Sequence, residues 1–565
     1  CGGFCPRDCG GKGGIGMSIL QEKIDALPIE ERAWLLGTKS KNPLGCAFAK
    51  KRVVHPGAGG KRMVMDKEEQ TRIWADLMAQ TPNPADERAV YIHIPFCDKK
   101  CSYCGFFQNF TREEAAHHYV DVLLDELDAA ADTPYVQGAP FQAVFFGGGT
   151  PTALSDADIA RLVQAVRARL PLTSDCEITL EGRIHDLTES KVEAAMNAGI
   201  NRFSLGVQSF DTRVRQAIGR IDDGETVIAT LRRMVEQQGA VVIADLIYGL
   251  PYQSMEVWEN DVRTQFEIGI AGGDLYQLNV FPSSELARRV ASGDLPMLPT
   301  TEEQAEYFRR GIDIVMEYPM VRRIDTTHWA TDHRERSIYN TLAKRGCDVL
   351  AFGSGAGGFI GQMMWRNHGA LAPYEKMVEE GAKPFQFMGE QADAHRMQSE
   401  IGDQIEHGYL YAPFFTKKYG VDLLTEMEPL LAAWAENGLV TRTETGFRLT
   451  RAGEFWHDNL IQGFLEAYAL TQEDTVKLRK ENVAVQDMIP KSVRSMLEAM
   501  FPDGMPAQMA AALAGKPSPE MENHPHMQML KELIRKEREK ERAAGADHDL
   551  NTVMRTQSRD LGKAV

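Results

Sequence analysis

The spacing of hydrophobic and polar positions changes along this 565-residue chain, and the change predicts its architecture. From about residue 88 to 360, short β-rich runs alternate with stretches whose apolar residues recur at helical spacing. The runs are AVYIHI, AVFFGG, EITLE, RFSLGV, VVIADLIYGL and DLYQLNVF, and the helical stretches cover residues 113–131, 154–169, 188–198, 224–238 and 254–268. Strands that alternate with helices of this length predict an α/β fold with a parallel sheet. Six such units are enough for a partial (β/α)6 barrel of the TIM type.

The pattern after the barrel is helical and ends in two short β-like runs. Residues 395–460 contain helices followed by NGLVTRTETGFRLTRAGEFW, with a turn around residues 444–446. Helices followed by a small hairpin resemble a winged-helix domain, which on an acidic chain we expect to be a lid or docking module. We therefore predict a partly disordered N-terminal extension, a barrel, a helical C-terminal domain and a Met-rich, charged helical tail, at residues 1–65, 66–375, 376–475 and 476–565.

Two stretches of the N-terminal extension have unusual compositions. The first, CGGFCPRDCGGKGGIG, contains Cys1, Cys5 and Cys9 and is interpreted as an unstructured extension, with a second cluster site as the alternative. The second, residues 39–62, carries seven basic residues and no acidic one. It is either a solvated loop or a clamp for the carboxylates of a large anionic ligand.

Composition and charge exclude several classes of protein. The apolar fraction of 43% and the charged fraction of 25% are ordinary for a globular protein. A net charge of −17 disfavours nucleic acid as a partner, because binding to phosphates depends on Lys and Arg. The chain shows neither an apolar run of about 18 residues nor a signal-peptide pattern, so we expect no membrane span and a cytoplasmic location. The nine cysteines favour metal ligation or reduced thiols over disulfides.

Three of these cysteines form the strongest chemical signal. Cys97, Cys101 and Cys104 follow a predicted strand within CDKKCSYC, and no fourth cysteine lies close by. Three thiolates can hold a [4Fe-4S] cluster and leave one iron open, which S-adenosylmethionine can chelate through its amino and carboxylate groups. Electron transfer to the bound sulfonium then yields a 5′-deoxyadenosyl radical. The alternative is a zinc site, which normally needs four ligands and would use His93 or Cys176 as a remote fourth.

Other uncommon residues lie at the carboxyl ends of the predicted strands, where barrel enzymes place their chemistry. GGGTP, Glu181, Gln208 and Asp245 occupy these positions on four strands, as Cys97 does after the first strand. The pattern therefore predicts one site at this end of the barrel.

The order of the motifs resembles that of the radical S-adenosylmethionine superfamily, and specifically its HemN-related branch. CDKKCSYC is preceded by YIHIPF and followed by GGGTP, ITLE, NRFSLGVQSF, AIGR and DLIYGLP, and the resemblance covers roughly residues 88–460. It implies a barrel of the radical S-adenosylmethionine type with a HemN-like C-terminal domain. It also implies a [4Fe-4S] cluster on Cys97, Cys101 and Cys104.

The resemblance further implies which residues bind the cofactor. The glycine run and one tyrosine would lie near the methionine moiety, because glycines allow the backbone to approach a ligand closely. Acidic and amide side chains would contact the ammonium and ribose hydroxyl groups. The implied cofactor-binding residues are Tyr91, Phe106, Gly147, Gly148, Gly149, Thr150, Glu181, Gln208, Arg220 and Asp245.

Within the branch, the chain most resembles the anaerobic haem-degradation methyltransferases of the ChuW/HutW type. The shared segments are YCGFFQN, ITLEGR, THWA, RERSIYN and AFGSGAGG. The chain departs from coproporphyrinogen dehydrogenases of the HemN type at Phe106, where they carry a further cysteine, and at EGRIHD, where they carry an acid-Val-Asp-Pro-like segment. It departs from the related haem chaperones at Gly105, where they carry Asp, and lacks their Asn-Pro after the glutamate.

The activity implied by this resemblance is radical methylation of haem, with opening of the porphyrin ring to a linear tetrapyrrole and release of iron. Two molecules of S-adenosylmethionine would take part, one supplying the radical and the other the methyl group. The implied partners are haem as substrate and reduced flavodoxin or another electron donor. The alternatives are a haem chaperone of the HemN-related type and an oxygen-independent coproporphyrinogen III dehydrogenase.

A haem substrate needs an apolar slot, cations for its propionates and an axial ligand. His328, in TTHWA, is the candidate catalytic residue that faces the substrate, and Trp329 is able to stack on a flat ring. The alternative is that both pack inside the fold. The candidate cations, which are otherwise ordinary surface arginines, are Arg322, Arg323, Arg334 and Arg336.

Overall fold

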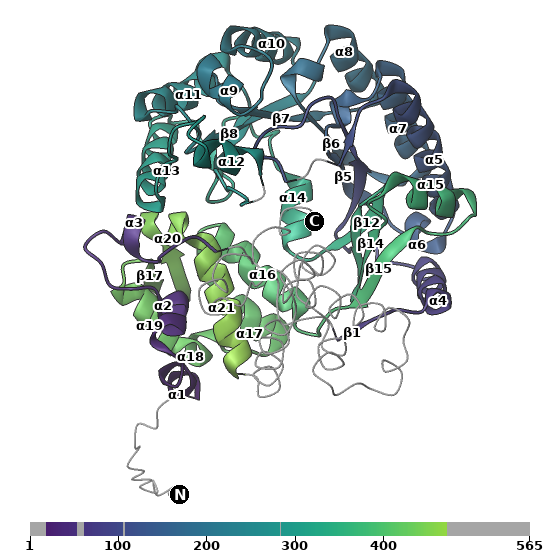
Figure 1. Ribbon diagram of the computed structural model, residues 1–565. Coiled ribbons are helices and arrows are strands. Elements are labelled where there is room, and N and C mark those ends of the chain that lie inside the picture. The colour runs from purple at the N-terminus through teal and green to yellow at the C-terminus, as the bar shows by residue number, and fades with distance from the viewer. Residues whose placement is uncertain (1–18, 53–60, 106–107, 283, 472–565) are drawn as a thin grey trace, which may run out of the picture.

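The computed structural model describes residues 19–52, 61–105, 108–282 and 284–471, and it confirms the predicted α/β fold (Figure 1). A curved sheet of 13 strands forms its centre. The order across the sheet is β1 (Arg62–Met63), β15 (Phe385–Glu390), β14 (Met363–Asn367), β13 (Gly357–Ile360), β12 (Asp348–Phe352), β2 (Arg88–Ile94), β5 (Phe141–Gly148), β6 (Leu172–Gly182), β7 (Arg202–Gln208), β8 (Val241–Tyr248), β9 (Gly272–Gln277), β11 (His328–Ala330) and β10 (Arg322–Arg323).

The strands from β12 through β2 to β9 are parallel, and six of them are the predicted strands. Every residue of β2 is buried, as expected for a central parallel strand that is covered on both faces. Helices cover the outer face of the sheet (Figure 1). They are α5 (Glu113–Ala131), α7 (Asp156–Arg169), α8 (Glu189–Ala198), α10 (Gly224–Gln237), α11 (Met255–Ile268) and α13 (Thr301–Met316).

Local sequence explains where these helices begin. Ser155, Thr188, Asp223 and Ser254 each precede a helix and accept a hydrogen bond from the third following backbone N–H. Thr300 forms a capping box at the start of α13. Such side chains satisfy N–H groups that have no partner in the first helical turn, so they fix the start of each helix.

The sheet continues with antiparallel strands on both sides, which the hydrophobic pattern does not predict. Strands β13, β14, β15 and β1 follow β12 on one side, and β11 and β10 follow β9 on the other. Because β15 pairs with β14, the sheet continues past residue 375, at which the barrel was predicted to end.

Shorter elements connect the barrel. The strands β3 (Phe96–Cys97) and β4 (Asn109–Phe110) form a separate parallel pair. The other elements of this region are α4 (Lys67–Met78), α6 (Pro134–Gln137), η1 (Pro151–Ala153), η2 (Ile184–Asp186), α9 (Thr212–Ala217), α12 (Glu285–Ala291), α14 (Ile338–Lys344) and α15 (Leu371–Glu379).

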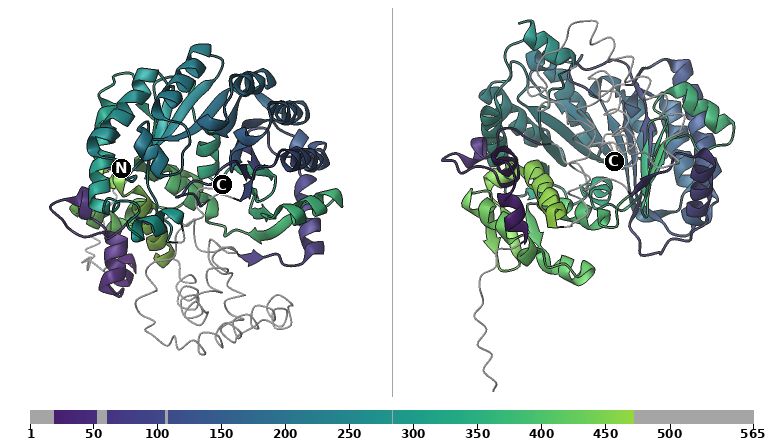
Figure 2. Two further views of the ribbon diagram at one scale, coloured as in Figure 1. Left: turned by 45° about the horizontal axis from the view of Figure 1, so that its top comes forward. Right: turned by 60° about the horizontal axis from the view of Figure 1, so that its bottom comes forward.

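A smaller C-terminal domain packs beside the barrel and contains the predicted hairpin (Figure 2). Its three-stranded sheet has the order β16 (Tyr409–Tyr411), β18 (Gly446–Leu449) and β17 (Val440–Thr443). Its helices are α16 (His395–Glu406), α17 (Ala412–Tyr419), α18 (Leu423–Glu426), α19 (Glu428–Glu436), α20 (Arg451–Phe455) and α21 (His457–Thr471). Helices with one small sheet agree with the predicted HemN-like helical domain.

In the described part of the predicted extension 1–65, three helices pack against the C-terminal domain. In both views of Figure 2 they lie against the C-terminal helices, and they are α1 (Ile19–Asp25), α2 (Ile29–Leu36) and α3 (Pro43–Cys46). The indole N–H of Trp434 donates to the carbonyl of Leu35 at 3.1 Å, and that of Trp456 donates to the carbonyl of Pro43 at 3.0 Å. Residues 1–18, with Cys1, Cys5 and Cys9, and the tail 472–565 lie outside the described residues.

In the described part of the basic stretch 39–62, several of the basic side chains pair with carboxylates of this chain, which argues against a ligand clamp. Lys39 pairs with Glu436, Arg52 with Glu466, and Arg62 with Glu69 and Glu390. Within the described ranges, no helix is long and apolar enough to cross a membrane.

Candidate active site

The loop with the three cysteines begins at the end of β3 and is closed by the pairing of β3 with β4. Cys97 is the last residue of β3, and its Sγ lies 3.2 Å from the hydroxyl oxygen of Thr150. The backbone N–H of Cys104 donates to the carbonyl of Cys101 at 3.2 Å, which forms a turn. Cys97 and Cys101 are buried, Cys104 is partly buried, and all three are unoxidised. The loop therefore presents three thiols from a compact backbone.

The three thiols line one cavity of about 220 Å³ at the carboxyl ends of the barrel strands. This position is the one that the strand pattern predicts. The predicted site residues on the cavity wall are Cys97, Cys101, Cys104, Gly148, Gly149, Thr150, Glu181, Gln208, Arg220 and Asp245.

The alternative zinc site is not supported by the positions of its candidate fourth ligands. His93 and Cys176 do not line this cavity. The His93 Nδ1 lies 3.0 Å from the hydroxyl of Tyr91, and Cys176 is buried near the start of β6. Among the described residues, no three His, Cys, Asp or Glu side chains are placed to hold a single metal ion. Thiolates of a cluster bind different irons, so this observation does not bear on the cluster.

Two predicted residues, Tyr91 and Gly147, lie just behind the cavity wall. A Cβ atom on Gly147 would lie 2.8 Å from Oε2 of Glu181 and 3.1 Å from Cε2 of Tyr91. The ring of Tyr91 stacks on Phe145 at a centroid distance of 6.4 Å. Position 147 therefore has no space for a side chain between Glu181 and Tyr91.

The glycine run 147–149 is required by the packing of the protein itself. A Cβ on Gly148 would lie 2.6 Å from Cε1 of His93, and one on Gly149 would lie 2.6 Å from the carbonyl oxygen of Phe96. Gly148 also has a φ of 113°, which other residues rarely adopt. The glycines thus let β5 approach the strand and turn that lead to the cysteines. The sequence analysis explains the glycines only by close approach to a ligand, and this contact within the protein is a second reason for them.

Glu181 and Asp245 place two buried carboxyl groups on the cavity wall. Glu181 accepts a hydrogen bond from the backbone N–H of Gly148 at 3.2 Å, and burial raises its pKa to about 7. Burial also raises the pKa of Asp245 well above its usual value, and the nearby carboxylates of Asp274 and Glu181 add to this effect. A cationic or hydroxyl-bearing ligand would stabilise both carboxylates.

Three predicted residues have buried polar atoms without a hydrogen-bond partner in the described part of the chain. These atoms are Oε1 of Gln208, Nε of Arg220 and Oδ1 of Asp245. Gln208 also has a φ of 73°, a strained value for a residue with a side chain. Buried polar atoms are normally paired, so the wall fits a polar ligand such as S-adenosylmethionine beside the thiols.

Phe106 lies outside the described residues, so its predicted contact with the cofactor stays a prediction.

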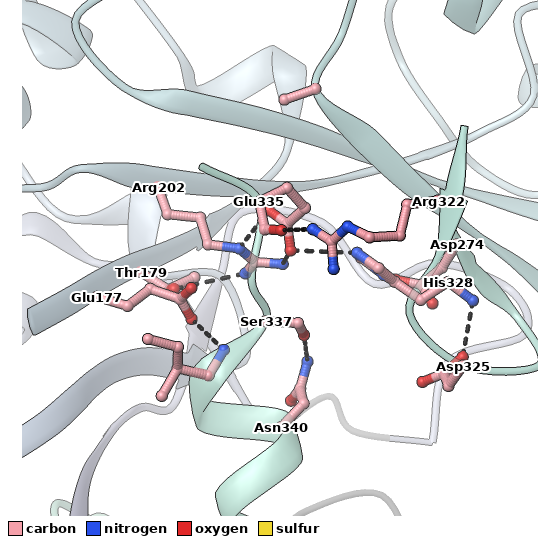
Figure 3. A network of polar contacts seen from close by, with 12 residues as sticks. Glu177, Thr179, Arg202, Asp274, Arg322, Asp325, His328, Glu335, Ser337 and Asn340 are labelled. Carbon is pink, nitrogen blue, oxygen red and sulfur yellow. Dashed lines mark hydrogen bonds and ion pairs between the residues drawn. The ribbon is translucent and has the colours of Figure 1, made fainter. Parts of the chain in front are cut away.

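His328 was predicted to face the substrate, but it is not among the residues that line the cavity. Its side chain lies instead in a network of polar contacts (Figure 3). Its side chain is 3% exposed, with Nδ1 at 2.7 Å from Oδ2 of Asp274 and Nε2 at 3.1 Å from Oε1 of Glu335. Burial alone would lower its pKa, but the Asp274 and Glu335 carboxylates raise it to about 10. The protonated ring donates from both nitrogens, so it has no free lone pair for iron.

Trp329 and the nearby arginines are also occupied within the protein. Trp329 is buried and stacks on Phe266 at a centroid distance of 4.4 Å, so it is not available for a planar substrate. The four candidate cations bind groups of this chain through the pairs Arg322 with the Glu335 carbonyl, Arg323 with Glu454, Arg334 with Asp332 and Arg336 with Asp175.

The cavity also contains residues that the sequence analysis does not single out. They are Lys99, Lys100, Tyr103, Gly182, Arg183, Ser204 and Gly206. Arg183 follows Glu181 by two positions, and Ser204 and Gly206 lie on β7, next to β6. Their position near the carboxyl ends of predicted strands is the signal that could have found them.

Comparisons with known proteins agree with this geometry. A family model described as the Radical SAM superfamily matches residues 91–264. Anaerobilin synthase from Escherichia coli O157:H7 is 38% identical over 428 residues, which are 74% of this chain and 92% of that protein. Heme chaperone HemW from Bacillus subtilis (strain 168) is 29% identical over 392 residues, 67% of this chain and 99% of that protein.

Among solved structures, coproporphyrinogen III oxidase (HemN) from Escherichia coli has the same fold. Its TM-score is 0.63 at 24% identity, and the match covers 73% of this chain and 96% of that one. The extent and identity of the match to anaerobilin synthase, together with the family model, decide the classification. The chain belongs to the radical S-adenosylmethionine superfamily, in the family that includes anaerobilin synthase.

Proposed function

We propose that this protein degrades haem without oxygen, as a radical S-adenosylmethionine methyltransferase that opens the porphyrin ring and releases iron. The single observation that carries the proposal is the 38% identity to anaerobilin synthase over 92% of that protein. The cavity with three thiols and unpaired polar atoms provides a site for the radical chemistry.

Cys97, Cys101 and Cys104 would hold the [4Fe-4S] cluster that proteins of this superfamily use together with S-adenosylmethionine. When bound, the cofactors supply a 5′-deoxyadenosyl radical. Glu181 would bind the ammonium group of the cofactor, and Asp245 and Gln208 would bind ribose hydroxyl groups through their unpaired oxygens.

A second molecule of S-adenosylmethionine would supply the methyl group, and reduced flavodoxin or another donor would supply electrons. Haem would enter from the open side of the cavity. Because His328, Trp329 and the four arginines are engaged elsewhere, we assign no haem contact to them.

The test is an anaerobic assay with reconstituted protein, haem, S-adenosylmethionine and a low-potential reductant. We expect the Soret band to decrease and 5′-deoxyadenosine to accumulate in the same samples. A Soret band that persists would favour a haem chaperone, which HemW exemplifies among the relatives. Consumption of coproporphyrinogen with no effect on haem would favour the dehydrogenase activity.

A further inference from the structure

Two arginines hold the loop that carries the cysteines, and one of them has no role in the proposed function. Arg183, the first residue after β6, donates from Nη1 to the carbonyl oxygen of Lys99 at 2.8 Å. Arg220 donates from Nη2 to the hydroxyl of Tyr103 at 3.1 Å. Lys99 and Tyr103 lie between the cysteines, so the loop is held by guanidinium groups at two points.

The guanidinium of Arg183 is fixed and largely removed from water. Its Nε donates to Oδ2 of Asp186 at 3.1 Å, and the two side chains are 12% and 2% exposed. Its Nη2 is buried and has no hydrogen-bond partner among the described residues. A buried donor without a partner costs free energy, so an anion is expected beside it when the site is loaded.

Asp186 already pairs with Nε of Arg183, and the three thiols line the same cavity as Arg183, so the cluster would be a second anion beside this guanidinium. A [4Fe-4S] cluster held by three thiolates carries a net negative charge once the thiolates are counted, and reduction adds one further electron. A fixed cation in a water-poor cavity favours the more negative state, because electrostatic interactions are strong there.

We propose that Arg183 is the cation that stabilises the reduced state of the cluster and so raises its reduction potential. This inference rests on the proposed cluster site at Cys97, Cys101 and Cys104. The electron comes from an external one-electron, low-potential donor, and Arg183 itself is neither oxidised nor reduced. Arg183 is therefore a positioning residue that acts through charge and through its hydrogen bond to the loop.

The competing role for Nη2 is binding of a carboxylate, either of S-adenosylmethionine or of the substrate. The two roles differ in what they affect. A cation that acts on the cluster changes the reduction potential of protein without S-adenosylmethionine. A carboxylate-binding cation changes the affinity for that ligand and leaves the potential of the ligand-free cluster unchanged.

The test is a redox titration with dithionite, followed by electron paramagnetic resonance, on reconstituted full-length variants. We expect Arg183→Gln to lower the reduced-to-oxidised ratio at a fixed potential by about tenfold, equivalent to about 59 mV for a one-electron couple. Arg183→Lys keeps the charge and should stay near the wild-type midpoint. The control is Arg263→Gln, which removes an exposed arginine paired with Glu317 outside the cavity and should change nothing.

Iron content per chain is measured first, and it separates two failures. Wild-type protein that binds no cluster refutes the proposed site, whereas a loaded Arg183→Gln variant with the wild-type midpoint refutes only the inference. An Arg183→Lys variant that behaves like Arg183→Gln also refutes it. Should Arg183→Gln not bind the cluster, Arg183→His is used in its place. The midpoint potential of Arg183→His should lie below that of wild type at high pH, and it should approach the wild-type value on acidification, as the histidine becomes protonated.

Discussion

At the scale of single residues, burial determines the chemistry of the cavity. Glu181 and Asp245 have raised pKa values because their carboxyl groups are removed from water. A ligand that offers a positive charge or a hydroxyl hydrogen therefore stabilises the ionised form of both carboxyl groups. The thiols lie at the same wall, so a ligand that contacts the carboxyl groups also reaches the cluster position.

The cluster assignment predicts a specific effect of removing one thiol. Cys101→Ala should leave the fold intact, reduce the bound iron and abolish formation of 5′-deoxyadenosine, because one iron loses its ligand. The matched control is Cys46→Ala, in α3 and outside the cavity, which should keep both iron and activity. Iron analysis and chromatography of the nucleoside measure the effects. Unchanged cleavage in Cys101→Ala would remove the assignment.

Glu181 predicts how cofactor binding depends on pH. Its pKa of about 7 means that the carboxyl is mostly protonated at pH 6 and mostly ionised at pH 8. If the ionised form binds the ammonium group, affinity for S-adenosylmethionine should be about tenfold weaker at about pH 6 than at about pH 8. Isothermal titration calorimetry measures this affinity. The control Glu181→Gln should bind S-adenosylmethionine more weakly than wild type, with the same affinity at both pH values. Equal affinity of the wild type at both values would contradict the role.

Residues of the site could be predicted where they belong to a sequence motif. They could not be predicted where their role depends on which side chains the fold places beside them. The cysteines follow a predicted strand, and Glu181 and Asp245 lie on two others, so their convergence follows from the barrel. His328 also lies at a strand, but the sequence does not reveal that Asp274 and Glu335 occupy both of its ring nitrogens.

At the scale of elements, the junction of β5 with the cysteine loop depends on close backbone contact. The N–H of Gly149 donates to the carbonyl of Ile94 at 2.8 Å, and there is no space for a side chain. The strand that carries the glycines and the turn before the cysteines are therefore fixed relative to each other.

Gly149→Ala tests this junction. The new Cβ would lie 2.6 Å from the carbonyl of Phe96 and 3.0 Å from that of Ile94, and backbone atoms cannot move away cheaply. We expect a loss of about 1–3 kcal/mol in the free energy of unfolding, measured by chemical denaturation. Gly369→Ala is the matched control, because nothing lies within 4 Å of its added Cβ. Equal stability of the two variants would show that the junction is not tightly packed.

Elements were predicted from sequence where the spacing of apolar residues was regular. The six parallel strands and five helices of the barrel have strong patterns, and residues such as Ser155 and Ser254 mark helix starts. The antiparallel strands β13 and β14 were missed because both are short, and because β13 begins with two glycines, which are typical of a loop.

At the scale of the whole molecule, a buried charge network joins strands of the barrel interior (Figure 3). Arg202 on β7 makes two hydrogen bonds to Glu335, at 2.9 and 3.0 Å, and His328 on β11 bridges Glu335 to Asp274 on β9. The network thus connects the end of the parallel sheet to its antiparallel edge.

Breaking this network should destabilise the fold in a pH-dependent way. The pKa of Glu335 is about 2, below its usual 4.5, so its contribution is present above pH 4.5 and is lost as pH falls toward 2. The raised pKa of His328 contributes fully below pH 6.5, and that contribution is lost as pH rises through about 10. The loss in the free energy of unfolding caused by Glu335→Gln should therefore be largest between pH 4.5 and pH 6.5, at about 3–5 kcal/mol.

Denaturation of Glu335→Gln and wild type across this pH range measures the difference. Glu317→Gln, which breaks an exposed pair with Arg263, is the control and should have almost no effect at any pH. A difference that is independent of pH would contradict the ionic network.

The assembly of the molecule was the least predictable part. Helices α1 to α3 pack against the C-terminal domain through contacts such as that between Leu35 and Trp434, which are 399 positions apart. Local spacing of apolar residues does not show which surface a short helix covers.

The central claim is that this chain uses S-adenosylmethionine to methylate haem and open its ring. Mass spectrometry of the tetrapyrrole after anaerobic turnover with methyl-deuterated S-adenosylmethionine tests it most directly. We predict a linear, iron-free product that carries the deuterated methyl group. Haem that is recovered intact and unlabelled, from protein whose iron content confirms a loaded cluster, would contradict the account.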